Sequence, residues 1–201
     1  QGDVSKDEDC RAIVAATIDK WGRVDGLMNN AGMTQFNNDN SLDALTAEMF
    51  QRIYSVNVVG AYQMTRAVAP QMQEQGEGSI VNTSSIAGVM GVGSSMAYAA
   101  SKGAMNTMTL SLARYLAPQI RVIAIAPGFI TGRWWLDELG QEGYEKMVTS
   151  VEKSVPLEHA GTPEDMAEAA LFFLTGARNI TGEILISDAG MHLGGAPLKA
   201  R

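Results

Sequence analysis

The chain has 201 residues, of which 46% are hydrophobic and 18% are charged, as in a globular protein with a buried core. Its net charge of −7 argues against nucleic acid or an acidic membrane surface as a partner. It contains no apolar run of the ~18 residues that a membrane span needs, and its polar N-terminus is not a signal peptide.

The first predicted helix starts after Ser5 and ends at Gly22. Ser5 to Glu8 matches a capping box, in which a hydroxyl and a carboxylate satisfy free N–H groups reciprocally. Apolar residues then recur at helical spacing. The single cysteine, Cys10, is expected to be a small buried residue of this helix. Having no partner for an internal disulfide, it suits a reducing, cytoplasmic location.

A short buried strand over 24–28 is predicted to run into the tetrad Asn29-Asn30-Ala31-Gly32. Small residues at this point let the backbone approach a ligand at the carboxyl end of the strand. The following segment, 34–43, reads as a polar loop.

One long helix is predicted over 47–73, with Thr46 as its cap. Asn57 lies in its middle among β-branched residues, where asparagine is a poor choice on helix propensity. A local rule broken in this way often marks a functional site.

The strand predicted over 79–84 ends in paired serines, and Ser85 precedes Tyr98 by thirteen residues. Between them lies a glycine-rich segment, 86–96, and after them a helix to residue 116. Tyr98 and Lys102 are four residues apart, so on a helix they share one face. A positive charge about 4 Å from the phenol is worth roughly 4 kcal/mol at an effective dielectric of about 20. We therefore expect Lys102 to lower the pKa of Tyr98 towards neutrality, where acid–base groups work best.

The rest of the chain continues the alternation of strands and helices. An apolar strand over 120–126 ends at Pro127-Gly128, and a less regular, aromatic-rich insert covers 132–155. A helix capped by Thr162 and a last strand over 182–187 follow. This alternation predicts a parallel, doubly wound α/β sheet. His159 and His192 stand alone, without metal-ligand spacing, and read as structural or solvated.

These motifs, in this order, resemble the short-chain dehydrogenase/reductase family in its single-domain branch. The motifs are Asn29-Asn30-Ala31-Gly32, Asn57 with its neighbours, Ser84-Ser85, Tyr98 to Lys102 and Ala126 to Ile130, and the resemblance extends from Gly2 to about Gly194. It implies that residues 1–201 form one Rossmann-like domain with three α/β/α layers. It also implies NAD or NADP as cofactor and a homo-oligomer, a dimer or tetramer.

By this resemblance the catalytic residues are Asn57, Ser85, Tyr98 and Lys102. Tyr98 protonates the substrate oxygen, Ser85 holds it, Lys102 also holds the nicotinamide ribose, and Asn57 anchors a relay water. The cofactor-binding residues implied are Asp3, Val4, Asn30, Ala31, Gly32, Tyr98, Lys102, Pro127, Gly128 and Ile130. Ser84 is expected to face the other side of its strand.

The expected reaction interconverts a secondary alcohol and a ketone by hydride transfer. The substrate pocket is expected between residues 90–96 and the insert around Trp134, whose aromatic side chains hint at an apolar or ring-bearing substrate. There is one departure from the family pattern. Gly132 stands where the family often has threonine, and Thr131 comes one position early, which puts a hydroxyl contact to the cofactor in doubt.

The glycine-rich turn that binds a pyrophosphate does not occur near the start of the sequence. Either an N-terminal β-α-β part precedes these residues in a longer polypeptide, which we favour, or the protein begins here with four of the usual seven strands. The residue that would select NAD or NADP lies in that part. Two alternatives to this oxidoreductase remain. One is a non-catalytic structural or regulatory subunit or fragment with weak or no cofactor binding, and the other is an epimerase or dehydratase of the extended branch.

Overall fold

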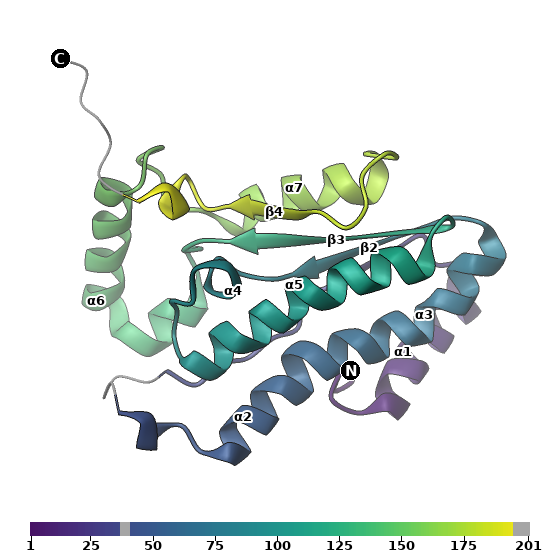
Figure 1. Cartoon of the computed structure of the whole chain (residues 1–201), viewed down its shortest axis with the longest axis horizontal. Coiled ribbons are helices and arrows are strands. Elements are labelled where there is room, and N and C mark those ends of the chain that lie inside the picture. The colour runs from purple at the N-terminus through teal and green to yellow at the C-terminus, as the bar shows by residue number, and fades with distance from the viewer. Residues whose placement is uncertain (37–40, 195–201) are drawn as a thin grey trace.

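The computed structural model describes residues 1–36 and 41–194, and Figure 1 shows its central parallel sheet. The strands are β1 (Gly26–Asn29), β2 (Gly78–Thr83), β3 (Ile120–Pro127) and β4 (Ile184–Ser187), side by side in the order β1-β2-β3-β4. Every neighbouring pair is parallel. The predicted doubly wound α/β fold is therefore confirmed, and all its strands end at one edge of the sheet.

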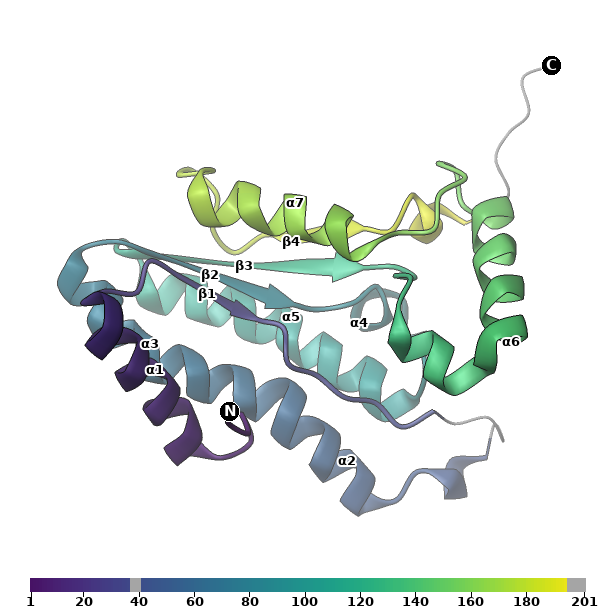
Figure 2. The same cartoon turned by 180° about the vertical axis from the view of Figure 1, so that it is seen from behind.

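Helices cover both faces of the sheet, which gives the predicted three layers (Figures 1 and 2). On β2, Ile80 packs into a cluster with residues of α1 (Asp7–Trp21), α3 (Ala61–Gln75) and α5 (Met96–Leu116). Its neighbour Val81 packs on the opposite face, against α7 (Pro163–Thr175). This change of face from one residue to the next is the period-two pattern of a strand, and it divides the core into two halves.

The predicted start of the first helix is wrong in detail. α1 begins at Asp7, and its N-cap is Lys6, which makes no side-chain cap bond. The hydroxyl of Ser5 instead donates to the carboxylate of Asp3 at 2.7 Å, so it does not cap the helix. The predicted end is right, because Gly22 adopts the left-handed conformation (φ 74°) that commonly terminates a helix.

The long predicted helix is divided into three parts. α2 (Ala47–Tyr54) is capped by the Thr46 hydroxyl as expected, and α3 follows a π-helical turn over Ser55–Gly60. Asn57 lies in that turn. The predicted helix is therefore interrupted at Asn57, and π-helical turns often occur at functional sites.

Glycine permits a close approach between the segments on either side of the site. The glycine-rich segment after β2 contains a short helix, α4 (Ala87–Met90), which packs on α5. A Cβ at Gly88 would lie 2.4 Å from the carbonyl carbon of Lys102. Only a glycine lets the two backbones approach this closely, and the approach helps to fix the position of Lys102.

The insert after β3 is more regular than predicted. It forms α6 (Arg133–Ser154), which is kinked at Gly140, where φ is 66° and ψ is 173°. The aromatic residues of this segment do not recur at helical spacing, so the sequence pattern did not indicate a helix. The next helix, α7, has the expected Thr162 cap in a full capping box with Asp165. Figure 1 shows α6 standing beyond the ends of the strands, across the edge where they terminate.

β1 forms an edge of the described sheet, because it pairs with β2 alone. Met28 on this strand is 40% exposed, so the edge carries exposed apolar surface. Within the described residues, no helix combines the length and hydropathy needed to cross a membrane. The predicted polar loop 34–43 falls partly on residues 37–40, which lie outside the described part of the chain.

Candidate active site

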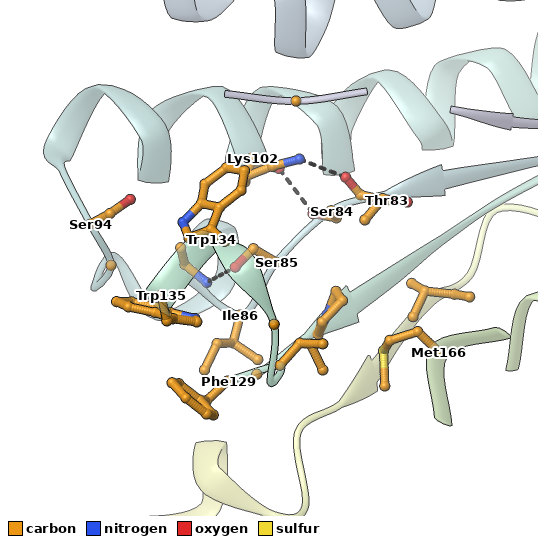
Figure 3. A pocket seen from close by; sticks show the side chains of 18 of the residues that line it. Thr83, Ser84, Ser85, Ile86, Ser94, Lys102, Phe129, Trp134, Trp135 and Met166 are labelled. Carbon is orange, nitrogen blue, oxygen red and sulfur yellow. Dashed lines mark hydrogen bonds between the residues drawn. The ribbon is translucent and has the colours of Figure 1, made fainter. Parts of the chain in front are cut away.

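A cavity of about 740 Å³ lies at the carboxyl ends of the strands, within the roughly 300–1,000 Å³ of small-molecule sites. Its walls include residues that follow β1, β2 and β3, together with the start of α6 (Figure 3). In open parallel α/β sheets, ligands bind at this edge. Of the predicted site residues, the cavity wall contains Asn30, Gly32, Ser85, Tyr98, Lys102, Pro127, Gly128 and Ile130.

The paired serines after β2 have different surroundings. Ser84 is buried, and its hydroxyl donates to Oδ1 of Asn106 at 2.5 Å and contacts the backbone carbonyl of Lys102 at 3.3 Å. Ser85 is half-buried and accepts from the backbone N–H of Ala87 at 3.1 Å, and its side chain is close enough to Tyr98 to influence the pKa of the phenol. Ser85 therefore presents its hydroxyl beside the phenol, while the hydroxyl of Ser84 is used within the fold.

Tyr98 and Lys102 lie one turn apart on α5, whose first turn is capped by the hydroxyl of Ser95. The Nζ atom of Lys102 lies 5.5 Å from the centre of the Tyr98 ring. Its hydrogen bond goes to the backbone carbonyl of Thr83 at 2.7 Å, and Figure 3 draws this bond. The ammonium is thus close to the ring but aimed at the end of β2.

The predicted lowering of the Tyr98 pKa does not occur in this structure. Burial raises the pKa of Tyr98, and the hydrogen bond with Ser85 offsets part of that effect. Burial also lowers the pKa of Lys102 to about 8. The expectation assumed a charge about 4 Å from a phenol in a solvated setting, but here the cost of removing both groups from water is the larger effect.

Asn57 connects the π-helical turn to the two segments beside it. Its Oδ1 accepts from the backbone N–H of Met33 at 2.8 Å, and its Nδ2 donates to the carbonyl of Met33 at 2.9 Å and to Ser101 Oγ at 3.0 Å. A Cβ placed on Gly32 would lie 3.5 Å from Asn57 Oδ1 and 3.7 Å from Lys102 Nζ. The side chains of Asn57 and Lys102 therefore meet at Gly32, on the side of the cavity reached by the tetrad.

The residues around Lys102 fit a cofactor with ribose hydroxyls. An ammonium has three N–H donors, and among the described residues Lys102 Nζ makes one hydrogen bond, to Thr83. A buried cation with spare donors at a cavity wall favours hydroxyl acceptors. Gly32 and Gly128 line the same wall without side chains.

The segment after β3 pairs with Gly161. Ile130 forms an isolated parallel bridge with Gly161, and the backbone N–H of Thr131 donates to the Gly161 carbonyl at 2.8 Å. In extended backbone, neighbouring N–H groups point to opposite sides, so the N–H of Ile130 is outside this pairing. The hydroxyl of Thr131 also donates to the Gly161 carbonyl, at 3.1 Å, so its proton is used within the protein and not for a contact to a cofactor.

Three predicted cofactor-binding residues are not brought to the cavity wall: Asp3, Val4 and Ala31. The carboxylate of Asp3 accepts from the backbone N–H of Ser5 at 2.9 Å, and hydrogen bonds from Ser5 lower its pKa. The carbonyl of Val4 accepts from Gln63 Nε2 at 2.8 Å. Val4 thus links α1 to α3, because its carbonyl also accepts from Cys10 Sγ at 3.3 Å.

Sequence reasoning missed two kinds of residue in the site. The first is Thr83, whose contribution is a backbone carbonyl and so leaves no side-chain signal. The second is the apolar lining of the cavity, to which Phe129, Met147, Met166 and Met191 contribute. Phe129 was detectable, because it lies between Gly128 and Ile130, both of which were predicted to face the cofactor.

The two histidines pair with carboxylates instead of gathering at a metal site. His159 Nε2 lies 2.8 Å from Asp165 Oδ2, and His192 Nδ1 lies 2.9 Å from Asp188 Oδ1. No group of three potential metal ligands occurs among the described residues. Both histidines therefore have local structural partners.

Comparisons with known proteins show the family of the chain. A family model described as enoyl-(acyl carrier protein) reductase matches residues 1–192. A Streptomyces violaceoruber protein named as ketoacyl reductase 2 of the granaticin polyketide synthase is 39% identical over 193 residues, 96% of this chain and 76% of that protein.

Solved structures resemble the chain over the same extent. A short-chain dehydrogenase/reductase from Burkholderia xenovorans matches with a TM-score of 0.87 and 43% identity, covering 96% of this chain and 75% of that one. ElxO with NADP bound matches with a TM-score of 0.85 and 31% identity, covering 95% of this chain and 76% of that one. NAD+-bound xylitol dehydrogenase matches with a TM-score of 0.81 and 31% identity, covering 92% of this chain and 75% of that one. The chain therefore belongs to the short-chain dehydrogenase/reductase family.

Proposed function

We propose that this chain carries the catalytic part of an NAD(P)-dependent oxidoreductase that interconverts a secondary alcohol and a ketone. The observation that carries the proposal is that Ser85, Tyr98 and Lys102 line one cavity, with the Lys102 ammonium 5.5 Å from the centre of the Tyr98 ring. We also propose that residues 1–201 belong to one Rossmann-like domain.

The cofactor is NAD or NADP, in keeping with the two relatives whose structures hold these molecules. Lys102 would hold the ribose through its spare N–H donors, with Gly32, Gly128 and the backbone of Ile130 on the same wall. When bound, the nicotinamide supplies or accepts the hydride at the carbon that carries the substrate oxygen. Asn57 fixes the loop that carries Gly32, because it holds both backbone groups of Met33.

In the direction of reduction, Ser85 donates a hydrogen bond to the substrate carbonyl oxygen. Tyr98 then gives its hydroxyl proton to that oxygen as negative charge develops there, so one O–H bond breaks and another forms. The buried phenol holds its proton at neutral pH, since burial raises the pKa of Tyr98. The positive charge of Lys102 stabilises the phenolate left behind. In oxidation the proton moves in the opposite direction, from the alcohol to the Tyr98 phenolate.

The test is Tyr98→Phe in the native full-length polypeptide. Turnover of ketones by NADH or NADPH should fall by at least ~100-fold, because general acid catalysis contributes about 10²–10⁴-fold. Thermal unfolding should stay close to that of the unmodified protein. Near-normal turnover by the Phe variant would refute the role of Tyr98.

A second candidate is a non-catalytic subunit with the same fold. The two functions are separated by the fluorescence of NADH or NADPH on addition of the full-length polypeptide. A change that saturates favours the enzyme, and no change at millimolar protein favours the subunit.

A further inference from the structure

Five aromatic rings form a wall in two groups at the start of α6, beside the cavity. The rings of Tyr98 and Trp134 have centroids 6.2 Å apart and planes tilted by 59°. Trp135 lies between Phe36, edge-on at 5.4 Å, and Phe129, stacked at 5.4 Å. Three separate segments converge here on the start of α6, so the wall is created by the tertiary fold.

The two adjacent tryptophans have different surroundings. Trp135 is half-buried and has a ring on each side, so it holds α6 against the loops after β1 and β3. Trp134 is 42% exposed, has one ring partner, Tyr98, and lines the cavity. Figure 3 shows the indole of Trp134 among the side chains that line the cavity. A ligand oxygen held by Ser85 and Tyr98 therefore places its flanking group against Trp134.

The cavity wall offers little to a charged ligand. Among its lining residues, only Lys102 and Arg133 carry a charge. Lys102 is buried and donates to the carbonyl of Thr83. The side chain of Arg133 is 89% exposed and lies 3.6 Å from the carboxylate of Asp137. A carboxylate near the reacting oxygen would lose its hydration without gaining an ion pair.

The shape of this wall favours a flat ring over a flexible chain. Aromatic faces prefer offset-stacked or edge-to-face neighbours, and the tilted pair of Tyr98 and Trp134 presents both a face and an edge. A rigid ring meets them without losing rotamer freedom, whereas an acyl chain loses part of its freedom when it is ordered. We propose that the substrate is an uncharged ketone or alcohol on or beside a flat ring, and that Trp134 is the residue that selects it.

This inference rests on the proposed function, and its test uses the native full-length polypeptide. Three ketones are compared with NADH and NADPH: 1-tetralone, which has an aryl ring, 2-pentanone, which is acyclic, and acetoacetate, which carries a carboxylate. Binding of 1-tetralol is measured in parallel by titration calorimetry, which does not depend on turnover. The variants are Trp134→Ala, Trp135→Ala and, as the control far from the cavity, Trp21→Ala.

The kcat/KM for 1-tetralone should exceed that for 2-pentanone by about 10–200-fold, the range that an apolar pocket provides. Trp134→Ala should remove most of this ratio, chiefly through KM for 1-tetralone, and leave 2-pentanone within ~3-fold. Trp135→Ala should lower kcat/KM for both ketones alike, because the Trp135 side chain positions α6. Trp21→Ala should change kcat/KM for neither ketone. Preference for 2-pentanone or acetoacetate, or an equal loss of both ketones in Trp134→Ala, would overturn the ring assignment.

Failure of the proposed function looks different. In that case no ketone is reduced, but 1-tetralol still binds, and more weakly in Trp134→Ala, so the ring site stands without the chemistry. Reduction of 2-pentanone or acetoacetate with 1-tetralone inert gives the opposite result. The chemistry then stands and the ring assignment falls.

Discussion

The ammonium of Lys102 lies 5.5 Å from the centre of the Tyr98 ring, yet it donates its hydrogen bond to the carbonyl of Thr83. The strand therefore takes part in placing the charge. Because Thr83 is the last residue of β2 and Ser85 follows two residues later, the same strand end positions both the cation and the hydroxyl beside the phenol. Burial of this pair has a consequence for stability that can be measured.

Stability should depend on pH through Lys102. Its pKa is about 8 in the folded protein against 10.5 as the ordinary value, so between these pH values the unfolded chain binds the extra proton. Unfolding free energy contributed by this group therefore rises with pH from about 8 towards 10.5, by up to roughly 3 kcal/mol. Lys102→Met lacks this titration, so its stability advantage over the unmodified protein should shrink between pH 7.5 and 9.5.

Urea unfolding of both proteins at these two pH values is the measurement. The range stops at 9.5 because burial raises the pKa of Tyr98, which acts in the opposite direction at higher pH. An unchanged difference between the two proteins would show that Lys102 titrates normally.

The two serines after β2 should separate stability from activity. Ser84→Ala removes a buried hydroxyl bonded to Asn106 and should cost about 1–2 kcal/mol, while turnover per folded molecule stays within ~3-fold. Ser85→Ala should lower turnover by ~100-fold or more and cost less than ~1 kcal/mol. Chemical unfolding and steady-state kinetics measure the two effects. The reverse pattern would assign the substrate oxygen to Ser84.

Asn57 should matter for both folding and the site. Asn57→Ala leaves the N–H and carbonyl of Met33 without their partners, and should destabilise the protein by about 2–4 kcal/mol. The matched control is Ser101→Ala, which removes a single acceptor of the same side chain and should cost about 1 kcal/mol. Equal losses in unfolding free energy would mean that the contacts to Met33 contribute little.

Gly88 and Gly103 face each other between α4 and α5, but substitution by alanine should act with opposite sign. A Cβ at Gly88 would lie 2.4 Å from a backbone atom of Lys102, so Gly88→Ala must separate the helices and should cost about 1–3 kcal/mol, with loss of turnover. A Cβ at Gly103 meets only the carbonyl of Gly88, at 3.6 Å, so Gly103→Ala should be neutral or stabilise α5 by up to about 1 kcal/mol. Melting curves of the two variants decide this, and a stabilised Gly88→Ala would contradict the packing.

The sequence by itself determined the strand and helix order and most of the cavity wall. Local chemistry is sufficient for these features: the alternating faces of Ile80 and Val81, the Thr46 and Thr162 caps, and the four-residue spacing of Tyr98 and Lys102 are all properties of short segments. Even the interruption at Asn57 was detectable, because its residue type conflicts with its predicted helix.

The tertiary structure alone decided which groups meet and how strongly they titrate. The contact of Lys102 with Thr83 joins a helix to a strand end, and the ring wall at Trp134 joins segments nearly a hundred residues apart. The direction of the Tyr98 pKa could not be read from spacing, since it depends on burial. Desolvation and long-range contact are properties of the packed chain, and no local pattern of residues encodes them.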